Sequence, residues 1–157
     1  MNRRNILSLS ATAALGLAVL PINAVAQQSE IDKVKATLDA FGAALSSLDI
    51  SKMDAVWAHD ADAMLINPRD KTVSVGWDAI KKNWEATFAF WSELKVTRTS
   101  GPIHVSGNVA WSLGSAEVVG KSKAGDAVSS PTFESDVFEK RGDRWLMVSH
   151  SAWRIPT

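Results

Sequence analysis

The sequence predicts an α+β fold in which three N-terminal helices pack on one face of a curved, mostly antiparallel sheet. In residues 29–48 and 77–91, apolar residues recur every three or four positions, which is the spacing of amphipathic helices. From residue 93 onward, long strand-like segments are separated by tight-turn sequences, so that consecutive strands are expected to pair antiparallel.

Three helices are predicted in the first part of the chain. The first spans residues 29–48, where one face carries Ile31, Val34, Leu38, Phe41, Leu45 and Leu48. Ser51 with Asp54 is a helix start signal, and it predicts a short second helix. The third spans residues 77–91 and has an acidic residue in its first turn, where the helix dipole favours an anion; its apolar side carries Trp77, Ile80, Trp84, Phe88 and Trp91.

The rest of the chain is predicted to form strands. Short strands at residues 62–68 and 72–75 precede the third helix, and Pro68 ends the first of them. Longer strand segments follow at 93–106, 109–121, 127–140 and 144–155. We find no internal repeat and no interdomain linker, which predicts a single domain.

Residues 1–26 have the pattern of a cleaved export signal. Arg3 and Arg4 precede an uncharged apolar run that is too short to span a bilayer comfortably, and Ala24-Val25-Ala26 has the form of a signal-peptidase site. The paired arginines resemble a twin-arginine signal. We therefore expect a mature domain of residues 27–157 that is periplasmic or secreted, with no membrane attachment after cleavage; an uncleaved membrane anchor is the alternative.

Composition excludes several classes of function. Two of the 17 basic residues lie in the predicted signal, so the mature domain is slightly acidic, and the lack of a basic block argues against a nucleic-acid partner. The chain has no cysteine, which excludes thiol catalysis and zinc-thiolate sites. Its three histidines are scattered, so we expect no metal site and no cofactor. Seven tryptophans supply large apolar faces, but the absence of tyrosine removes the phenol donor.

Strand alternation places the candidate polar side chains on particular faces of the sheet. Trp111 and Glu117 share a face of segment 109–121, and Asp136 shares a face with Glu134. In the last segment His150 lies on one face, with Trp145 and Trp153 on the other. Both faces therefore hold apolar residues, and periodicity alone does not identify the inner one.

A short turn constrains how the last two strands pair. If residues 141–143 form the loop, Lys140 lies opposite Arg144 and Glu134 lies opposite His150. Asp136 and His150 are then diagonal neighbours on one face. A carboxylate beside an imidazole is a candidate acid–base pair, because histidine titrates near neutral pH.

Three stretches, "LDISKMDAVWAHDADAMLINP", "GWDAIKKNW" and "FESDVFEKRGDRWLMVSH", resemble the SnoaL-like branch of the nuclear transport factor 2-like (NTF2-like) superfamily, which includes polyketide cyclases and ketosteroid isomerases. The resemblance covers residues 29–156. It implies a cone-shaped NTF2-like or cystatin-like fold, with a pocket at the open end of the cone. It also implies that the faces bearing Trp111, Asp136 and His150 look inward. The fold hosts isomerases, cyclases, dehydratases and binding modules, so it does not specify a reaction.

The isomerase pattern within this family is only partly present. The position of its general-base aspartate corresponds to Asn67, and the position of its oxyanion-hole tyrosine corresponds to Phe41. Its second oxyanion-hole group corresponds to Asp136, which is retained. We therefore do not expect ketosteroid isomerisation, although a pocket can persist without it. Asn67 is expected to serve as an amide donor or to form the turn before Pro68.

Our leading hypothesis is an apolar pocket that binds a small hydrophobic molecule and possesses acid–base chemistry of the isomerase, cyclase or lyase type. Asp136, kept protonated by apolar surroundings, donates to a developing oxyanion, and His150 moves the proton. The predicted ligand-binding residues are Asn67, Trp84, Phe88, Trp111 and Glu117. Glu117 is also a candidate replacement for the missing base, with a solvated surface group as its alternative.

The alternative is a non-catalytic module, in which Asp136 and His150 serve only as hydrogen-bonded structural groups. Such a module binds a ligand or forms a homodimer through the outer face of its sheet. Trp145 and Trp153, on the face opposite His150, favour the dimer, because exposed tryptophans tend to be covered.

Overall fold

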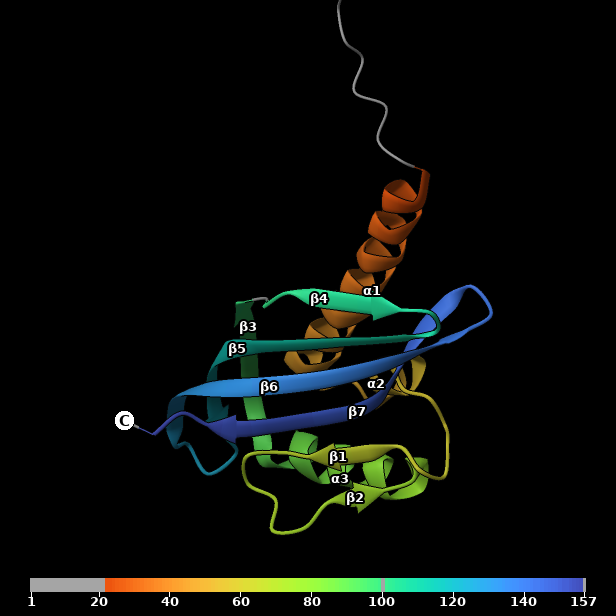
Figure 1. Ribbon diagram of the computed structural model, residues 1–157. Coiled ribbons are helices and arrows are strands. Elements are labelled where there is room, and N and C mark those ends of the chain that lie inside the picture. Colours follow the sequence, from red (N-terminus) through yellow and green to blue (C-terminus); the bar gives the residue numbers. More distant parts are fainter. Residues whose placement is uncertain (1–21, 100, 157) are drawn as a thin grey trace, which may run out of the picture.

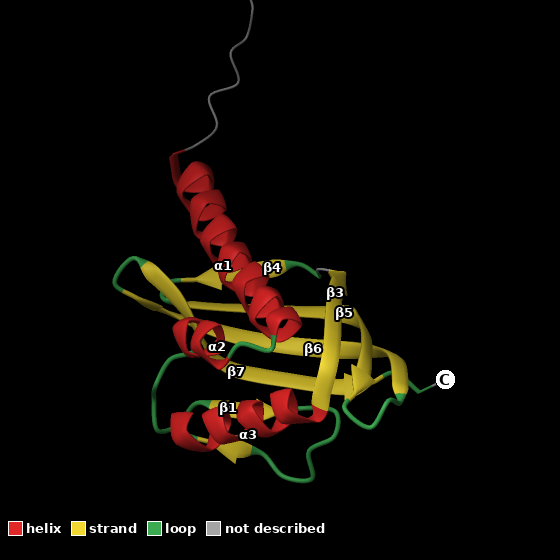
Figure 2. Cartoon of the chain, turned by 180° about the vertical axis from the view of Figure 1, so that it is seen from behind, coloured by secondary structure: helices red, strands yellow, loops and turns green. Residues whose placement is uncertain are grey.

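The computed structural model describes residues 22–99 and 101–156 of the 157-residue chain. Its elements, in order, are α1 (Ile22–Ser47), α2 (Ile50–Val56), β1 (Met64–Ile66), β2 (Ser74–Val75), α3 (Trp77–Phe90), β3 (Trp91–Thr99), β4 (Ile103–Ser106), β5 (Val109–Ser122), β6 (Ala127–Arg141) and β7 (Arg144–Arg154). The helices lie together on one side of the strands, as Figure 1 and the reverse view in Figure 2 show. The predicted α+β architecture is confirmed.

The strands form one curved sheet in the order β2-β1-β7-β6-β5-β3, with β4 paired to β5 next to β3. All neighbouring strands are antiparallel except β1 and β7, which run parallel. In Figure 2, β3 crosses steeply over the end of the long strands and closes one side of the helix-covered face. This curvature produces a concave inner face.

The predicted single strand over residues 93–106 is in fact two strands. β3 pairs with the second half of β5 and β4 pairs with its first half. Gly101 lies between them, where an added Cβ would be 1.6 Å from the carbonyl oxygen of Leu113. Only glycine allows so close an approach, and Pro102 has no N–H for a continuous ladder.

α1 buries the face that the apolar spacing predicts, including Val34, Leu38 and Phe41. The residue that caps α2 is Asp49 and not Ser51, because the Asp49 carboxylate accepts a hydrogen bond from the backbone N–H of Ser51 at 2.9 Å.

An early residue of α1 ties this helix to the β6–β7 hairpin. Glu30 accepts hydrogen bonds from the indole N–H of Trp145 at 2.8 Å and pairs with Lys140 at 2.9 Å. Hydrogen bonds from Lys33, Lys140 and Trp145 lower the pKa of Glu30 to about 2. The helix is therefore held against the sheet at Glu30 by charge as well as by apolar contact.

The predicted register of the last hairpin is wrong both in the length of its loop and in the pairing beyond a bulge. Arg141 pairs with Arg144, so the loop contains only Gly142 and Asp143. Farther along, Phe138 pairs with Met147 and Val137 pairs with Ser149, which leaves Val148 as an extra residue in a β-bulge. Beyond this bulge, Asp136 and His150 lie directly opposite each other and are not diagonal neighbours.

The bulge also changes which side chains of β7 face inward. Before it, Trp145 and Met147 are buried; after it, His150 and Ala152 are buried. A regular strand would place Trp145 and His150 on opposite faces, as the alternation predicted. That prediction is wrong for Trp145, which is only 3% exposed, whereas Trp153 does lie on the outer face and is 45% exposed.

The inner face of β5 is the reverse of the expected one. Because Ser112 pairs with Asp136, these two residues share the inner face. Trp111 and Glu117 then point outward, and the inward-facing side chains of this strand include the small Ala110 and Ala116. The expectation that the face bearing Trp111 looks inward is therefore wrong.

Most of the predicted export signal, residues 1–21, lies outside the described residues. The Ala24–Ala26 motif lies in the first turns of α1, where its residues are exposed. No helix in the described part of the chain is both long and apolar enough to cross a membrane.

Candidate functional site

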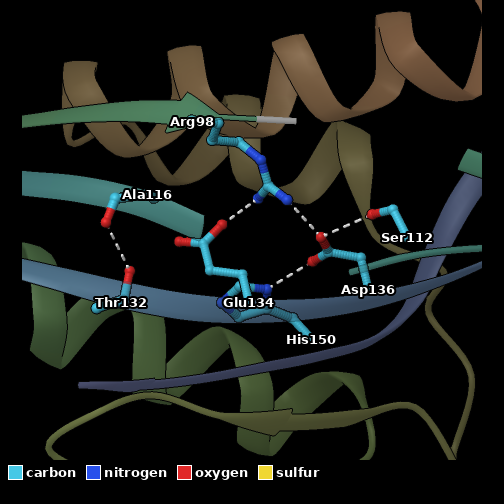
Figure 3. Close-up of polar contacts among 7 residues, drawn as sticks. All are labelled: Arg98, Ser112, Ala116, Thr132, Glu134, Asp136 and His150. Carbon is cyan, nitrogen blue, oxygen red and sulfur yellow. Dashed lines mark hydrogen bonds and ion pairs between the residues drawn. The ribbon is translucent and has the colours of Figure 1, made fainter. Parts of the chain in front are cut away.

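A buried network of charged side chains lies on the inner face of the sheet (Figure 3). Arg98 reaches it from β3, Ser112 from β5, Glu134 and Asp136 from β6, and His150 from β7. The Arg98 guanidinium forms ion pairs with both carboxylates, through Nη1 to Glu134 and through Nη2 to Asp136 Oδ2 at 2.6 Å. Carboxylates that are buried away from water need such a partner, because an unpaired buried charge is costly in free energy.

Asp136 lies at the centre of the network and has no exposed surface. Its Oδ2 accepts hydrogen bonds from Arg98 and from the Ser112 hydroxyl at 3.2 Å, and its Oδ1 faces His150 Nδ1 at 2.7 Å. Burial raises the pKa of Asp136, but its hydrogen bond with His150 and its ion pair with Arg98 lower it by more, so this pKa lies below its usual value.

Asp136 is therefore a carboxylate, and the expectation that apolar surroundings keep it protonated is wrong. An ionised carboxylate accepts hydrogen bonds and donates none, so it cannot act as an oxyanion-hole donor. Its geometry instead suits it to orient His150.

His150 stands between this carboxylate and the helices. Its ring is 3% exposed and packs against the rings of Phe41 and Trp84, with centroids 4.9 Å and 6.2 Å away. Since Asp136 can only accept, Nδ1 carries the hydrogen of their contact. Nε2 has no hydrogen-bond partner among residues 22–99 and 101–156. It is therefore available to a molecule in the adjoining cavity.

A partly enclosed cavity of about 120 Å³ adjoins His150. Its wall is mainly apolar and includes Leu45, Trp84, Trp91, Leu94, Val96, Val118 and Val128. Polar groups enter it from Glu134 and His150 at the sheet and from Asn67 on the loop after β1. An engineered cavity of about 150 Å³ is known to hold benzene, so this space suits a molecule of about one ring.

The structure brings some of the predicted site residues to this cavity and keeps others away. Asn67, Trp84 and His150 line it. Asp136 touches His150 from behind and is not part of the wall. Phe88 is buried beside Trp84, at a ring centroid distance of 6.0 Å, and also lies outside the wall.

Trp111 and Glu117 are not at the cavity, which corrects their predicted placement. Trp111 is 43% exposed on the outer face, where its ring stacks on His104 at 5.5 Å. Glu117 is also exposed and accepts a hydrogen bond from Ser129 at 2.8 Å. Neither side chain can act on a molecule beside His150, because the sheet lies between them.

Asn67 has the two structural roles expected from its place before a proline. Its carbonyl oxygen accepts the backbone N–H of Asp70 at 2.9 Å, which closes the turn after β1. Its side-chain amide donates to Asn83 on α3 at 2.9 Å. Asn83 in turn donates to the Asp70 carboxylate, so this polar network fixes the loop at the cavity mouth.

Arg98, Ser112 and Glu134 belong to this network but were not among the site residues predicted from the sequence. Alternation already placed Glu134 on the face of Asp136, and this was a usable signal. Arg98 follows Leu94 and Val96 on one face of β3, and a single cation in line with apolar residues suggests a buried partner. Among the described residues, no group of three or more potential ligands is placed to hold a metal ion.

Comparison with known proteins agrees with the observed architecture. The SnoaL-like domain family matches residues 34–153, and no curated protein matches the chain. A predicted dehydratase of the NTF2-like family from Streptomyces avermitilis has a TM-score of 0.75 and 16% identity, over 83% of this chain and 99% of that one. A predicted scytalone dehydratase from Novosphingobium aromaticivorans has a TM-score of 0.76 and 13% identity, over 85% and 89%.

A ketosteroid isomerase-like protein from Erwinia carotovora atroseptica has a TM-score of 0.70 and 18% identity, over 82% of this chain and 98% of that one. At these identities the structural matches establish the fold alone, whereas the family match spans most of the sequence. The chain therefore belongs to the SnoaL-like domain family, with the NTF2-like fold that its sequence resembles.

Proposed function

We propose that this protein binds a small, mainly apolar molecule in the cavity beside His150 and that His150 moves a proton on that molecule. The observation that carries the proposal is the contact of His150 Nδ1 with the buried Asp136 carboxylate at 2.7 Å. The His150 side chain also lines the cavity. A neutral imidazole held this way presents the Nε2 lone pair to the cavity, which is the arrangement of a general base.

The proton transfer follows from the roles of these groups. Nε2 of His150 takes a proton from a carbon or a hydroxyl of the bound molecule, and the imidazolium that forms is stabilised by the adjacent Asp136 carboxylate. The same nitrogen then returns the proton to another atom of that molecule. Isomerisation and dehydration both include such a transfer, and relatives of this fold are described as a ketosteroid isomerase-like protein and as predicted dehydratases.

Filling the cavity should prevent binding. Ala152 lines the cavity and is 6% exposed, so an Ala152→Leu side chain would occupy the space of a one-ring ligand. We expect cyclohex-2-enone or phenol to bind the natural chain saturably and to bind the variant at least about tenfold more weakly. Tryptophan fluorescence and calorimetric titration measure this binding.

The matched control is Ala43→Leu, at an exposed position of α1. It should bind both ligands as the natural chain does. Equal binding by Ala152→Leu would place the ligand elsewhere, and the absence of saturable binding to the natural chain would contradict the proposal.

Export to the periplasm or beyond stays a prediction from residues 1–26.

A second candidate function, a homodimer through the outer face of the sheet, is favoured by a separate observation. Trp111, Leu113, Phe133 and Trp153 lie on this face and are 43%, 57%, 42% and 45% exposed. Phe133 and Trp153 are directly paired, with ring centroids 6.2 Å apart. Monomeric proteins seldom leave contiguous apolar patches of this kind uncovered.

Sedimentation tests this dimer directly. We expect the natural chain to sediment as a dimer at micromolar concentration and the Leu113→Glu variant as a monomer, because a charge cannot be buried there without a partner. Val75→Glu, at a position that is 56% exposed on β2, should remain dimeric. A monomeric natural chain at high micromolar concentration would rule the dimer out.

A further inference from the structure

Two arginines at the cavity have no anionic partner among the residues that the structure describes. Of the five arginines in the described part of the chain, Arg98 and Arg141 form ion pairs and Arg144 donates to a backbone carbonyl at 2.7 Å. Arg69 and Arg154 both line the cavity, yet neither has an ion pair or hydrogen bond within residues 22–99 and 101–156. Their guanidinium groups are therefore free to bind an anion.

The strand pairing brings these two residues to the same end of the site. β1 and β7 are parallel neighbours, and Ile66 pairs with Ser151. Arg69 follows Ile66 by three residues and Arg154 follows Ser151 by three residues. Since parallel strands run in the same direction, both arginines lie at the same end of these strands. Both line the cavity and are exposed, so they mark its mouth.

Arg69 is also held in place. Its guanidinium carbon lies 3.6 Å from the centre of the Phe90 ring, which is a cation–π contact. Stacking uses the face of the guanidinium and leaves its N–H edge available, and this edge matches the two oxygens of a carboxylate. A ligand therefore meets a cation whose orientation is already restricted.

The carboxylates that line the cavity cancel only part of this charge. Asp70, at the mouth, accepts two N–H groups, from the Asn67 backbone at 2.8 Å and from Asn83 at 2.9 Å. Glu134, at the sheet, is paired with Arg98. Arg69, Arg154 and Asp70 together therefore give the mouth one net positive charge, and the cavity continues with apolar walls to His150.

From this arrangement we infer that the ligand is a small organic acid, of about one ring, whose carboxylate is bound by Arg69 and Arg154 while its apolar body extends toward His150. The inference rests on the proposed function, because it assigns a ligand class to the same cavity. It adds the anionic group, which neither the apolar wall nor the His150–Asp136 pair requires.

Benzoate and its neutral counterpart benzamide test whether the cavity prefers an anionic ligand or simply binds an apolar one, because the two molecules have nearly the same shape and differ in charge. We expect benzoate to bind the natural chain about tenfold more tightly than benzamide. Arg69→Gln and Arg154→Gln should each weaken benzoate binding by about three- to tenfold and leave benzamide binding unchanged. Calorimetric titration measures all of these affinities, and unchanged benzamide binding shows that each variant is folded.

Lys71→Gln is the matched control, since it removes one positive charge two residues from Arg69 at an exposed position outside the cavity wall. It should change benzoate affinity by less than about twofold, because Lys71 does not line the cavity and an exposed charge without a direct contact contributes little. Benzamide binding equal to that of benzoate, or an equal effect of Lys71→Gln, would overturn this inference and leave the proposed function standing. Failure of both ligands to bind would overturn both.

Discussion

Replacing Arg98 with methionine is expected to destabilise the protein by about 3–5 kcal/mol, because removal of one partner leaves buried charges uncompensated. The Arg98 side chain is 15% exposed, and the two carboxylates that it pairs are 4% and 0% exposed. Methionine fills much of the same volume but supplies no N–H donor. Urea denaturation of the natural and variant chains measures the difference in the free energy of unfolding.

Two further variants make this result specific to the network. Arg154→Met removes an exposed arginine that has no ion pair with any described residue, and it should change stability by no more than about 0.5 kcal/mol. Adding Glu134→Gln to Arg98→Met should recover part of the loss, because one of the two orphaned carboxylates is then neutral. Losses that simply add, or an Arg98→Met chain within about 1 kcal/mol of the natural one, would contradict the role assigned to Arg98.

Replacing His150 with alanine is expected to lower proton exchange on a bound ketone by about 10²- to 10⁴-fold, which is the usual contribution of a general base. The reaction to follow is the exchange of hydrogen for deuterium next to the carbonyl of cyclohex-2-enone in D₂O, measured by proton NMR. Ligand binding to the variant, followed by fluorescence, shows whether the cavity persists. His104→Ala removes a histidine that stacks on Trp111 at the outer face of the sheet. This variant should catalyse exchange of the ketone hydrogens at the natural rate.

Asp136→Asn distinguishes orientation from proton transfer. An amide opposite Nδ1 can donate, so it favours the tautomer in which Nε2 carries the hydrogen and is no longer a base. Exchange should therefore fall even though His150 is present, and the maximal rate should fall more than the affinity for the ketone. Exchange by His150→Ala at the natural rate would sink the proton-transfer proposal.

The order of helices and strands could be predicted from the sequence because these patterns are local. The face of α1 that carries Phe41 follows from the periodicity of that helix, whereas the inward direction of the β6 face that carries Asp136 followed from the family resemblance. The short loop between β6 and β7 also allowed us to predict that Asp136 and His150 lie close together, although it did not give their direct pairing. Turn chemistry and spacing are properties of neighbouring residues.

Relations between strands were harder to predict. One extra residue, Val148, shifts the register of β7 and brings Trp145 and His150 to the same side of the sheet. Nothing in the alternation of that strand marks the bulge, because both of its faces carry apolar residues. The orientation of Trp111 likewise depends on which β6 residue pairs with Ser112, which the β5 sequence does not specify.

The sequence by itself determined the fold class, the helical faces and the family to which the chain belongs, because these rest on short-range periodicity and on motifs. Only the tertiary structure decided the chemistry of the site. It brought His150 from β7 and Arg98 from β3 to Asp136, and these two contacts lower the pKa of Asp136, which composition could not reveal, since a pKa depends on neighbours that are distant in sequence. It also placed Arg69 and Arg154 in the wall of one cavity, because the parallel pairing of β1 with β7 brings the ends of these two strands to the same side of the sheet.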